Sequence, residues 1–301
     1  MPPTLRILLF LVCAILASGG FVAKTFAQSA GSAGDNPSCL EVPGAITLFD
    51  RPQIHVVWIG ELHGTNEMPA MFGDLACAAG MSGRTVIIAL ERNTDEQPLW
   101  DAWLKSDGSN EAERSLLGGS DWSNEQFRNI GKDGRSSEAM LGLAERLRTY
   151  KKKGLILDIR VFRPALPAMP ADGNLDEVVN EGMAQQISNI VEQYPNALVL
   201  AYSGGVHGRR NMRPGLNFHP AASLLPPAQL LSVRLVGGDG EAWNCGGNEC
   251  KTYSTRGVVR PRGIVFAENV TTDKDLLSDG GFDALAFTGV RSTASLPAQQ
   301  P

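Results

Sequence analysis

Short apolar runs recur along this chain, and a longer amphipathic stretch separates most of them. A run of about four to eight apolar residues rich in Val and Ile is typical of a strand buried on both faces of a parallel sheet. The expected strands are residues 55–59, 85–90, 155–162, 197–202, 230–236 and 284–288, with one more within 257–270, and the expected helices are 68–79, 97–105, 136–153 and 176–193. We therefore predict a single-domain α/β fold with a mainly parallel β-sheet flanked by helices on both faces. The last third has fewer helices, which predicts a mixed sheet with antiparallel strands at its edge.

The composition agrees with one sizeable core, because 43% of the residues are hydrophobic and 20% are charged, as in ordinary globular domains. The net charge is −5, so the chain lacks the strongly basic surface with which proteins bind nucleic acid or anionic lipid. We therefore expect a small-molecule or peptide substrate and no nucleic-acid partner.

The first 30 residues have the features of a secretory signal peptide. Arg6 precedes the apolar run Ile7–Ala17, and the small residues Ala23, Ala27 and Ala30 follow it. The run is shorter than the roughly 20 residues that span a membrane. We predict cleavage and an exported protein, periplasmic or secreted, with no integral membrane segment after signal removal. The expected parts of the chain are a signal peptide (1–30), an N-terminal arm (31–53), the α/β domain (54–291) and a disordered tail (292–301).

Four cysteines remain once the signal is removed, and an even number in an exported chain favours disulfide bonds. Cys245 and Cys250 are separated by Gly-Gly-Asn-Glu, which lets the chain reverse sharply, so we predict a local disulfide there. Cys39 and Cys77 would then join the N-terminal arm to the first helix. A thiolate metal site is the less favoured alternative, because no second closely spaced cysteine pair lies near the first.

Polar residues follow several of the expected strands, at the sheet edge where ligands bind in open α/β folds. Glu61 and His63 follow the first strand in the sequence Gly-Glu-Leu-His-Gly, and Glu91 ends the second strand. His207 lies in Gly-Gly-Val-His-Gly after the strand at 197–202. Two of the chain's four histidines thus share one G-x-x-H pattern, and we predict that the four residues converge as a catalytic site.

Two imidazoles and a carboxylate suit a divalent transition metal such as Mn, Zn or Co with an open position for water. His63, Glu91 and His207 are the expected ligands. The same residues would also serve as a metal-free general base with an orienting carboxylate. For either histidine alone, a structural role at the end of a strand is the simpler interpretation.

Three further residues are candidates for substrate binding. Glu67 shares a helix face with His63 if a helix starts there, and Arg92 follows Glu91 directly. Arg135, in Asp-Gly-Arg-Ser-Ser, would clamp a substrate carboxylate or stabilise an oxyanion. Alternatively, this segment is a turn whose serine caps the next helix.

The strings GELHGTNE, IIALERN and GGVHGRR resemble the superfamily that groups erythromycin esterase-like proteins, ChaN-like haem-binding proteins and the Tiki (TraB/GumN) metalloproteases. The resemblance covers residues 54–210. By this resemblance His63, Glu91 and His207 match the core functional positions, Glu61 the acid before the first histidine, and Glu67 an acid of the esterase-like branch. We therefore expect an exported, metal-assisted hydrolase that activates water at this two-histidine and carboxylate site and cleaves an ester or an amide/peptide bond. The alternative is a ChaN-like haem-binding protein in which a histidine or Tyr202 meets the iron.

Overall fold

The computed structural model describes residues 39–123, 132–165, 173–246, 249–269 and 281–301. The predicted signal peptide and the first part of the predicted N-terminal arm, residues 31–38, lie outside these ranges. Within them, the arm contains the short helix α1 (Ile46–Phe49). In this part of the chain, no helix combines the length and the apolar character needed to cross a bilayer.

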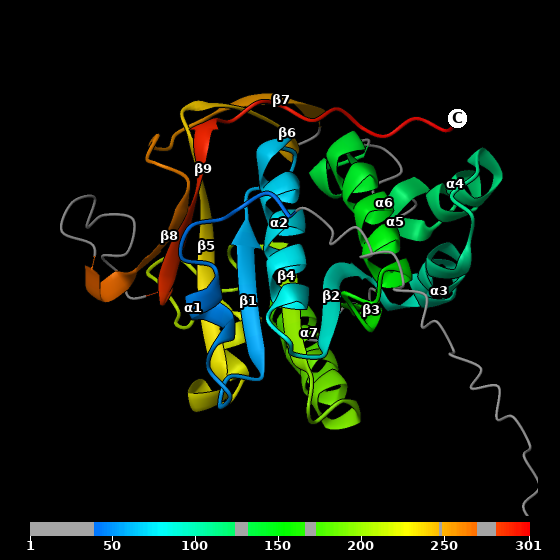
Figure 1. The fold of residues 1–301 in the computed structure, drawn as a ribbon. Coiled ribbons are helices and arrows are strands. Elements are labelled where there is room, and N and C mark those ends of the chain that lie inside the picture. The colour runs from blue at the N-terminus through cyan, green and yellow to red at the C-terminus, as the bar shows by residue number, and fades with distance from the viewer. Residues whose placement is uncertain (1–38, 124–131, 166–172, 247–248, 270–280) are drawn as a thin grey trace, which may run out of the picture. The chain divides into compact units, whose positions relative to one another are not determined.

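Seven strands form one sheet in the order β3-β2-β4-β1-β5-β9-β8 (Figure 1). The strands are β1 (Val56–Glu61), β2 (Val86–Asn93), β3 (Asp158–Arg163), β4 (Leu198–Gly204), β5 (Leu230–Gly238), β8 (Gly263–Phe266) and β9 (Ala284–Arg291). All neighbours are parallel except β8 and β9, which are antiparallel at the edge. The predicted mainly parallel sheet, mixed at its edge, is confirmed. A separate antiparallel hairpin consists of β6 (Gly240–Gly246) and β7 (Glu249–Thr255).

Helices cover both faces of the sheet, and the side chains of the central strands alternate between them. Val57 and Ile59 of β1 belong to the larger core, which packs against α2 (Glu67–Met81), α3 (Gln97–Lys105) and α6 (Glu138–Lys152). Val56 and Trp58 belong to the second core, against α7 (Leu175–Gln193). Because both faces are covered, every residue of β1, β2 and β4 is buried, which accounts for their continuous apolar sequences.

The polar, glycine-rich stretch 107–135 has no long apolar pattern and was not among the expected helices, but α4 (Asn110–Leu117) and α5 (Ser120–Ser123) lie in its described part. The side chain of Ser109 caps α4. Each helix is too short to give a clear apolar periodicity, and polar and glycine-rich residues flank both. The sequence pattern therefore does not reveal them.

Both predicted disulfides are present in the structure, Cys39–Cys77 and Cys245–Cys250. The first joins the N-terminal arm to α2. The second links directly opposed residues of β6 and β7, close to the reversal between these strands.

The C-terminal residues 292–301 are ordered, so the prediction of a disordered tail is wrong. The backbone N–H groups of Ser295 and Ala298 donate to the carbonyls of Gly64 and Ser136, and both tail residues are buried. The N–H of Glu138, in the first turn of α6, donates in turn to Leu296. The tail has no apolar periodicity because its main chain makes the contacts, and a periodicity argument cannot detect such contacts.

A chain shortened to end at Thr293 should lose these hydrogen bonds and expose buried backbone. At about 0.5–1.5 kcal/mol for each of several bonds, we expect the free energy of unfolding in urea to fall by about 2–4 kcal/mol. Removal of residues 299–301 alone is the control, because these residues are exposed. Equal stability of the two shortened chains would contradict the structural role of the tail.

Candidate functional site

The two G-x-x-H segments lie side by side because β1 and β4 are parallel neighbours. Glu61 is paired with Gly204 in register, and the N–H of Gly205 donates to the Glu61 carbonyl at 2.7 Å. On the other side of β4, β2 leaves its regular register with β3 between Leu90 and Asn93. Glu91 lies in this irregular stretch. Such irregularities reorient side chains next to functional sites.

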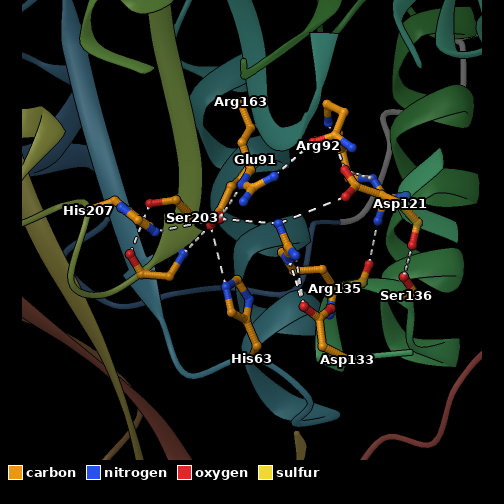
Figure 2. Close-up of polar contacts among 12 residues, drawn as sticks. His63, Glu91, Arg92, Asp121, Asp133, Arg135, Ser136, Arg163, Ser203 and His207 are labelled. Carbon is orange, nitrogen blue, oxygen red and sulfur yellow. Dashed lines mark hydrogen bonds and ion pairs between the residues drawn. The ribbon is translucent and has the colours of Figure 1, made fainter. Parts of the chain in front are cut away.

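The four predicted catalytic residues converge at this sheet edge. His63 Nδ1 lies 2.6 Å from Glu61 Oε1, and His63 Nε2 lies 3.4 Å from Glu91 Oε2. His207 Nε2 lies 3.6 Å from Glu91 Oε1. Figure 2 shows Glu91 between the two imidazoles. The predicted convergence of these residues is therefore confirmed.

Glu91 is the centre of this cluster and carries a negative charge. Its carboxylate accepts a hydrogen bond from the N–H of Gly204 at 2.7 Å, and Arg135 Nη1 lies 3.6 Å away. Burial raises the pKa of Glu91, but His207, His63 and Arg135 together hold it well below its usual range. The carboxylate is therefore ionised at neutral pH.

Gly204 lets the His63 ring lie close to the backbone of β4. A Cβ atom at this position would lie 2.8 Å from His63 Nε2 and 3.6 Å from Glu91 Oε2. A side chain here would therefore displace the His63 ring.

His63 is held in its charged form by two carboxylates. Burial lowers its pKa, but Glu61 and Glu91 raise it to about 10. The second oxygen of Glu61 accepts a hydrogen bond from the Tyr202 hydroxyl at 2.6 Å. Burial and Glu61 raise the pKa of Tyr202 well above its ordinary value. Tyr202, the iron ligand considered in the haem hypothesis, is thus buried and engaged with Glu61.

His207 is held in its neutral form by an amide side chain of α7. Asn180 Oδ1 lies 2.8 Å from His207 Nδ1 and accepts the N–H of Ala221 at 3.0 Å. Asn180 Nδ2 donates to the carbonyl of Asp176, which fixes the amide orientation. Since Oδ1 is an acceptor, Nδ1 of His207 must carry the proton, and the neutral ring keeps a lone pair on Nε2.

The charge state of His207 follows from its surroundings. Burial lowers its pKa and Glu91 opposes this effect, but the positive charges of His63, Arg163 and Arg135 add to the lowering. The result is a neutral imidazole next to a charged one, with Glu91 between them.

Arg135 reaches the site from the turn before α6. Asp133 holds its guanidinium through Nε and Nη2 at 3.1 and 2.8 Å and also accepts its backbone N–H. Ser137 caps α6, so this segment is both a helix-capping turn and part of the site. Arg163, at the end of β3, lies 3.9 Å from Glu91 and also belongs to the cluster.

The structure does not bring the predicted substrate-binding residues Glu67 and Arg92 to the centre of the site. Glu67 accepts hydrogen bonds from Thr293 in the C-terminal tail. Arg92 is fully buried, pairs with Glu96 and donates to the backbone carbonyl of Arg135 at 2.6 Å. Arg92 therefore supports the turn that carries Arg135.

Sequence reasoning missed Asn180, Asp133 and Arg163 as parts of the site. Asn180 could have been found as a polar residue among the apolar positions on the buried side of α7. Asp133 lies in the Asp-Gly-Arg turn that had already been noted, but its partner was not predictable from spacing.

A divalent metal does not fit the cluster well in this arrangement. Within the described ranges, no group of three or more His, Cys, Asp or Glu residues is placed to hold one. Glu91 faces the guanidinium groups of Arg135 and Arg163. The positive charges of these two arginines repel a cation.

A cavity of about 760 Å³ is lined by Glu61, His63 and His207. Residues of β5, β6 and β7 also line it. The hairpin β6–β7 lies beyond the carboxyl ends of the strands (Figure 1). The volume is in the range of sites that bind small molecules, about 300–1,000 Å³.

Comparison with known proteins identifies the fold. No model of a known family and no curated protein matches the sequence. An erythromycin esterase mutant in its open conformation is similar with a TM-score of 0.56 and 9% identity, over 85% of this chain and 98% of that chain. A protein from Bacillus cereus has a TM-score of 0.56 and 10% identity, over 86% of this chain and 96% of that chain. A succinoglycan biosynthesis protein has a TM-score of 0.54 and 10% identity, over 82% of this chain and 90% of that chain. The resemblance predicted from the motifs is thus confirmed at the level of the fold.

Gly64 offers a stability test of the loop that carries His63. Its φ is +81°, and an added Cβ would lie 1.7 Å from the carbonyl oxygen of Trp243. We expect Gly64→Ala to lower the free energy of unfolding by about 3 kcal/mol or more. Gly83→Ala is the matched control, since Gly83 has φ +83° but no atom within 4 Å of its Cβ position. For Gly83→Ala we expect the free energy of unfolding to fall by only about 1 kcal/mol, because backbone strain is the one cost. Similar losses in both variants would show that the contact with Trp243 is unimportant.

Proposed function

We propose that this chain is a hydrolase that cleaves an ester or an amide/peptide bond with water activated at the His63–Glu91–His207 cluster. The observation that carries this proposal is the position of the Glu91 carboxylate, 3.4 Å from the His63 imidazole and 3.6 Å from the His207 imidazole, because both histidines line a large cavity. The fold shared with an erythromycin esterase supports it.

His207 acts as the general base. Its neutral ring, fixed by Asn180, takes a proton from water on Nε2 as the water oxygen attacks the carbonyl carbon. Glu91 stabilises the imidazolium that forms. The same proton then passes from His207 to the leaving oxygen or nitrogen as the carbon–heteroatom bond breaks, which restores the neutral base.

His63 stabilises the oxyanion. The imidazolium of His63 is charged before the reaction begins, and a preorganised positive charge lowers the energy of the negative charge that develops on the carbonyl oxygen. Arg135 adds a second positive charge next to Glu91. The two histidines thus have different roles because their partners differ: a carboxylate for His63 and an amide for His207.

Export from the reducing cytosol is part of the same proposal. Disulfides persist in oxidising compartments such as the periplasm or the extracellular space. The pairs Cys39–Cys77 and Cys245–Cys250 support this location.

The first test is a screen of purified protein against ester, amide and peptide substrates. We expect His207→Gln and Glu91→Gln to lower kcat/KM by about 100-fold or more, since each removes part of the acid–base machinery. Glu111→Gln, the same kind of change at an exposed position of α4, is the control. We also expect activity to survive treatment with a chelator. Loss on chelation and recovery with Mn, Zn or Co would instead favour the metal-assisted form of the hydrolase.

The pH dependence follows from the charge states of the two histidines. The base must be neutral, so kcat/KM should rise with pH through a midpoint below 6.5, the ordinary value, because the pKa of His207 is lowered. His63 must be protonated, so kcat/KM should fall through a midpoint near pH 10.

Asn180→Asp separates this mechanism from alternatives. A carboxylate beside His207 Nδ1 favours the protonated ring, so the acid limb of the profile should move to higher pH by about one unit or more. An acid limb that stays in place in this variant would exclude His207 as the base.

A further inference from the structure

The cavity that begins at the two histidines continues into a region lined by arginines. Among the described residues that line the cavity, the positive groups beyond the histidines are Arg209, Arg213, Arg234 and Arg256, and the one carboxylate is Glu61. Glu61 already accepts hydrogen bonds from His63 and Tyr202. The cavity wall therefore has an excess of positive charge, although the whole chain is acidic.

Arg234 has an unusual place for a charged residue. It lies in β5 between β1 and β9, opposite Gly60 and Leu285, and it is the one residue of β5 that is not fully buried. Placing a guanidinium in an interior strand has a desolvation cost, which an apolar residue would avoid. Its side chain lines the cavity, where it is accessible to a ligand.

The other arginines complete a wall of the cavity. Arg209 is buried, stacks on Phe282 at 5.6 Å and donates to Asn211 at 3.1 Å, so its position is fixed. Arg213 and Arg256 are exposed, and neither has a carboxylate within ion-pair distance among the residues that the structure describes.

Apolar side chains also line the cavity. Leu235, Val236 and Phe282 contribute to its wall, and Tyr253 adds an aromatic ring from β7. These groups suit a hydrocarbon segment of the ligand, whereas guanidinium groups bind oxyanions through paired hydrogen bonds.

We infer that the substrate is an anion whose scissile bond lies at His63 and His207, whose apolar middle part packs against Val236 and Phe282, and whose terminal carboxylate or phosphate group is bound by Arg234, Arg213 and Arg256. The position of the scissile bond rests on the proposed function. The arginine site can be tested without turnover.

Calorimetric titration with octanoate, octyl phosphate and octanamide tests the binding site directly. The three probes share an alkyl chain, and only the first two carry a negative charge. We expect at least one anion to bind the wild-type protein 10-fold or more tightly than octanamide, by analogy with charge-assisted pairs worth about 1.5–3 kcal/mol. The anion that binds more tightly identifies the group for which the site is suited.

Two variants assign this preference to the arginines. Arg234→Gln and the double variant Arg213→Gln/Arg256→Gln should each reduce the preference for the anions over octanamide. The double variant should fold, because it changes only exposed side chains. Arg114→Gln, an exposed arginine of α4 outside the cavity, is the matched control and should keep the preference. Equal binding of octanamide and both anions, or an equal loss in Arg114→Gln, would overturn the inference.

Turnover of p-nitrophenyl valerate and the p-nitrophenyl monoester of glutaric acid gives the second readout. We expect kcat/KM to be 10-fold or more higher for the anionic ester, with the ratio near one in the arginine variants. If neither ester is cleaved but the anions still bind through the arginines, the hydrolase proposal fails and the anion site stands. If both esters are cleaved equally and the anions show no preference, the hydrolase stands and the anion site fails.

Discussion

Glu91 carries its charge at the end of β2, where 6% of the residue is exposed to solvent. An unpaired carboxylate so placed would cost several kcal/mol, so the surrounding structure has to supply positive charge and hydrogen-bond donors. Gly204, His63, Arg135 and Arg163 supply them, from β4, the loop after β1, the turn before α6, and β3. The charged groups need support of their own, which explains why Asp133 holds Arg135 and why Glu61 holds His63.

The two histidines show how environment assigns different chemistry to identical side chains. Both rings direct Nε2 toward Glu91, yet one Nδ1 meets a buried carboxylate and the other an amide oxygen. The carboxylate favours the imidazolium, whereas the amide favours a neutral ring with a defined tautomer. A pair of groups whose pKa values are moved apart is typical of acid–base sites. The same separation of charge makes the cluster a poor cage for a divalent cation.

The central strands and the site could be predicted because both leave local signals. Continuous Val- and Ile-rich runs indicated β1, β2 and β4, and the carboxyl ends of parallel strands necessarily meet at one edge, which brought His63 and His207 together. The supporting residues could not be predicted in the same way. Asn180 and Asp133 act through partners far away in sequence or through a turn geometry that spacing does not reveal. The ordered tail was missed because its contacts use main-chain groups, which are the same in every sequence.

Gly64 is the point at which three distant parts of the chain meet. Its carbonyl accepts the N–H groups of Trp243 and Ser295, and Gly134 packs against its backbone so closely that a Cβ there would lie 2.2 Å from Gly64 N. Contacts between residues so far apart in sequence form late in folding, because the entropy of closing long loops must be overcome first. The loop that carries His63 therefore takes its final shape only when the domain is complete. A chain from which Trp243 or Ser295 is still missing therefore lacks the contacts that hold His63 beside Glu91 and His207.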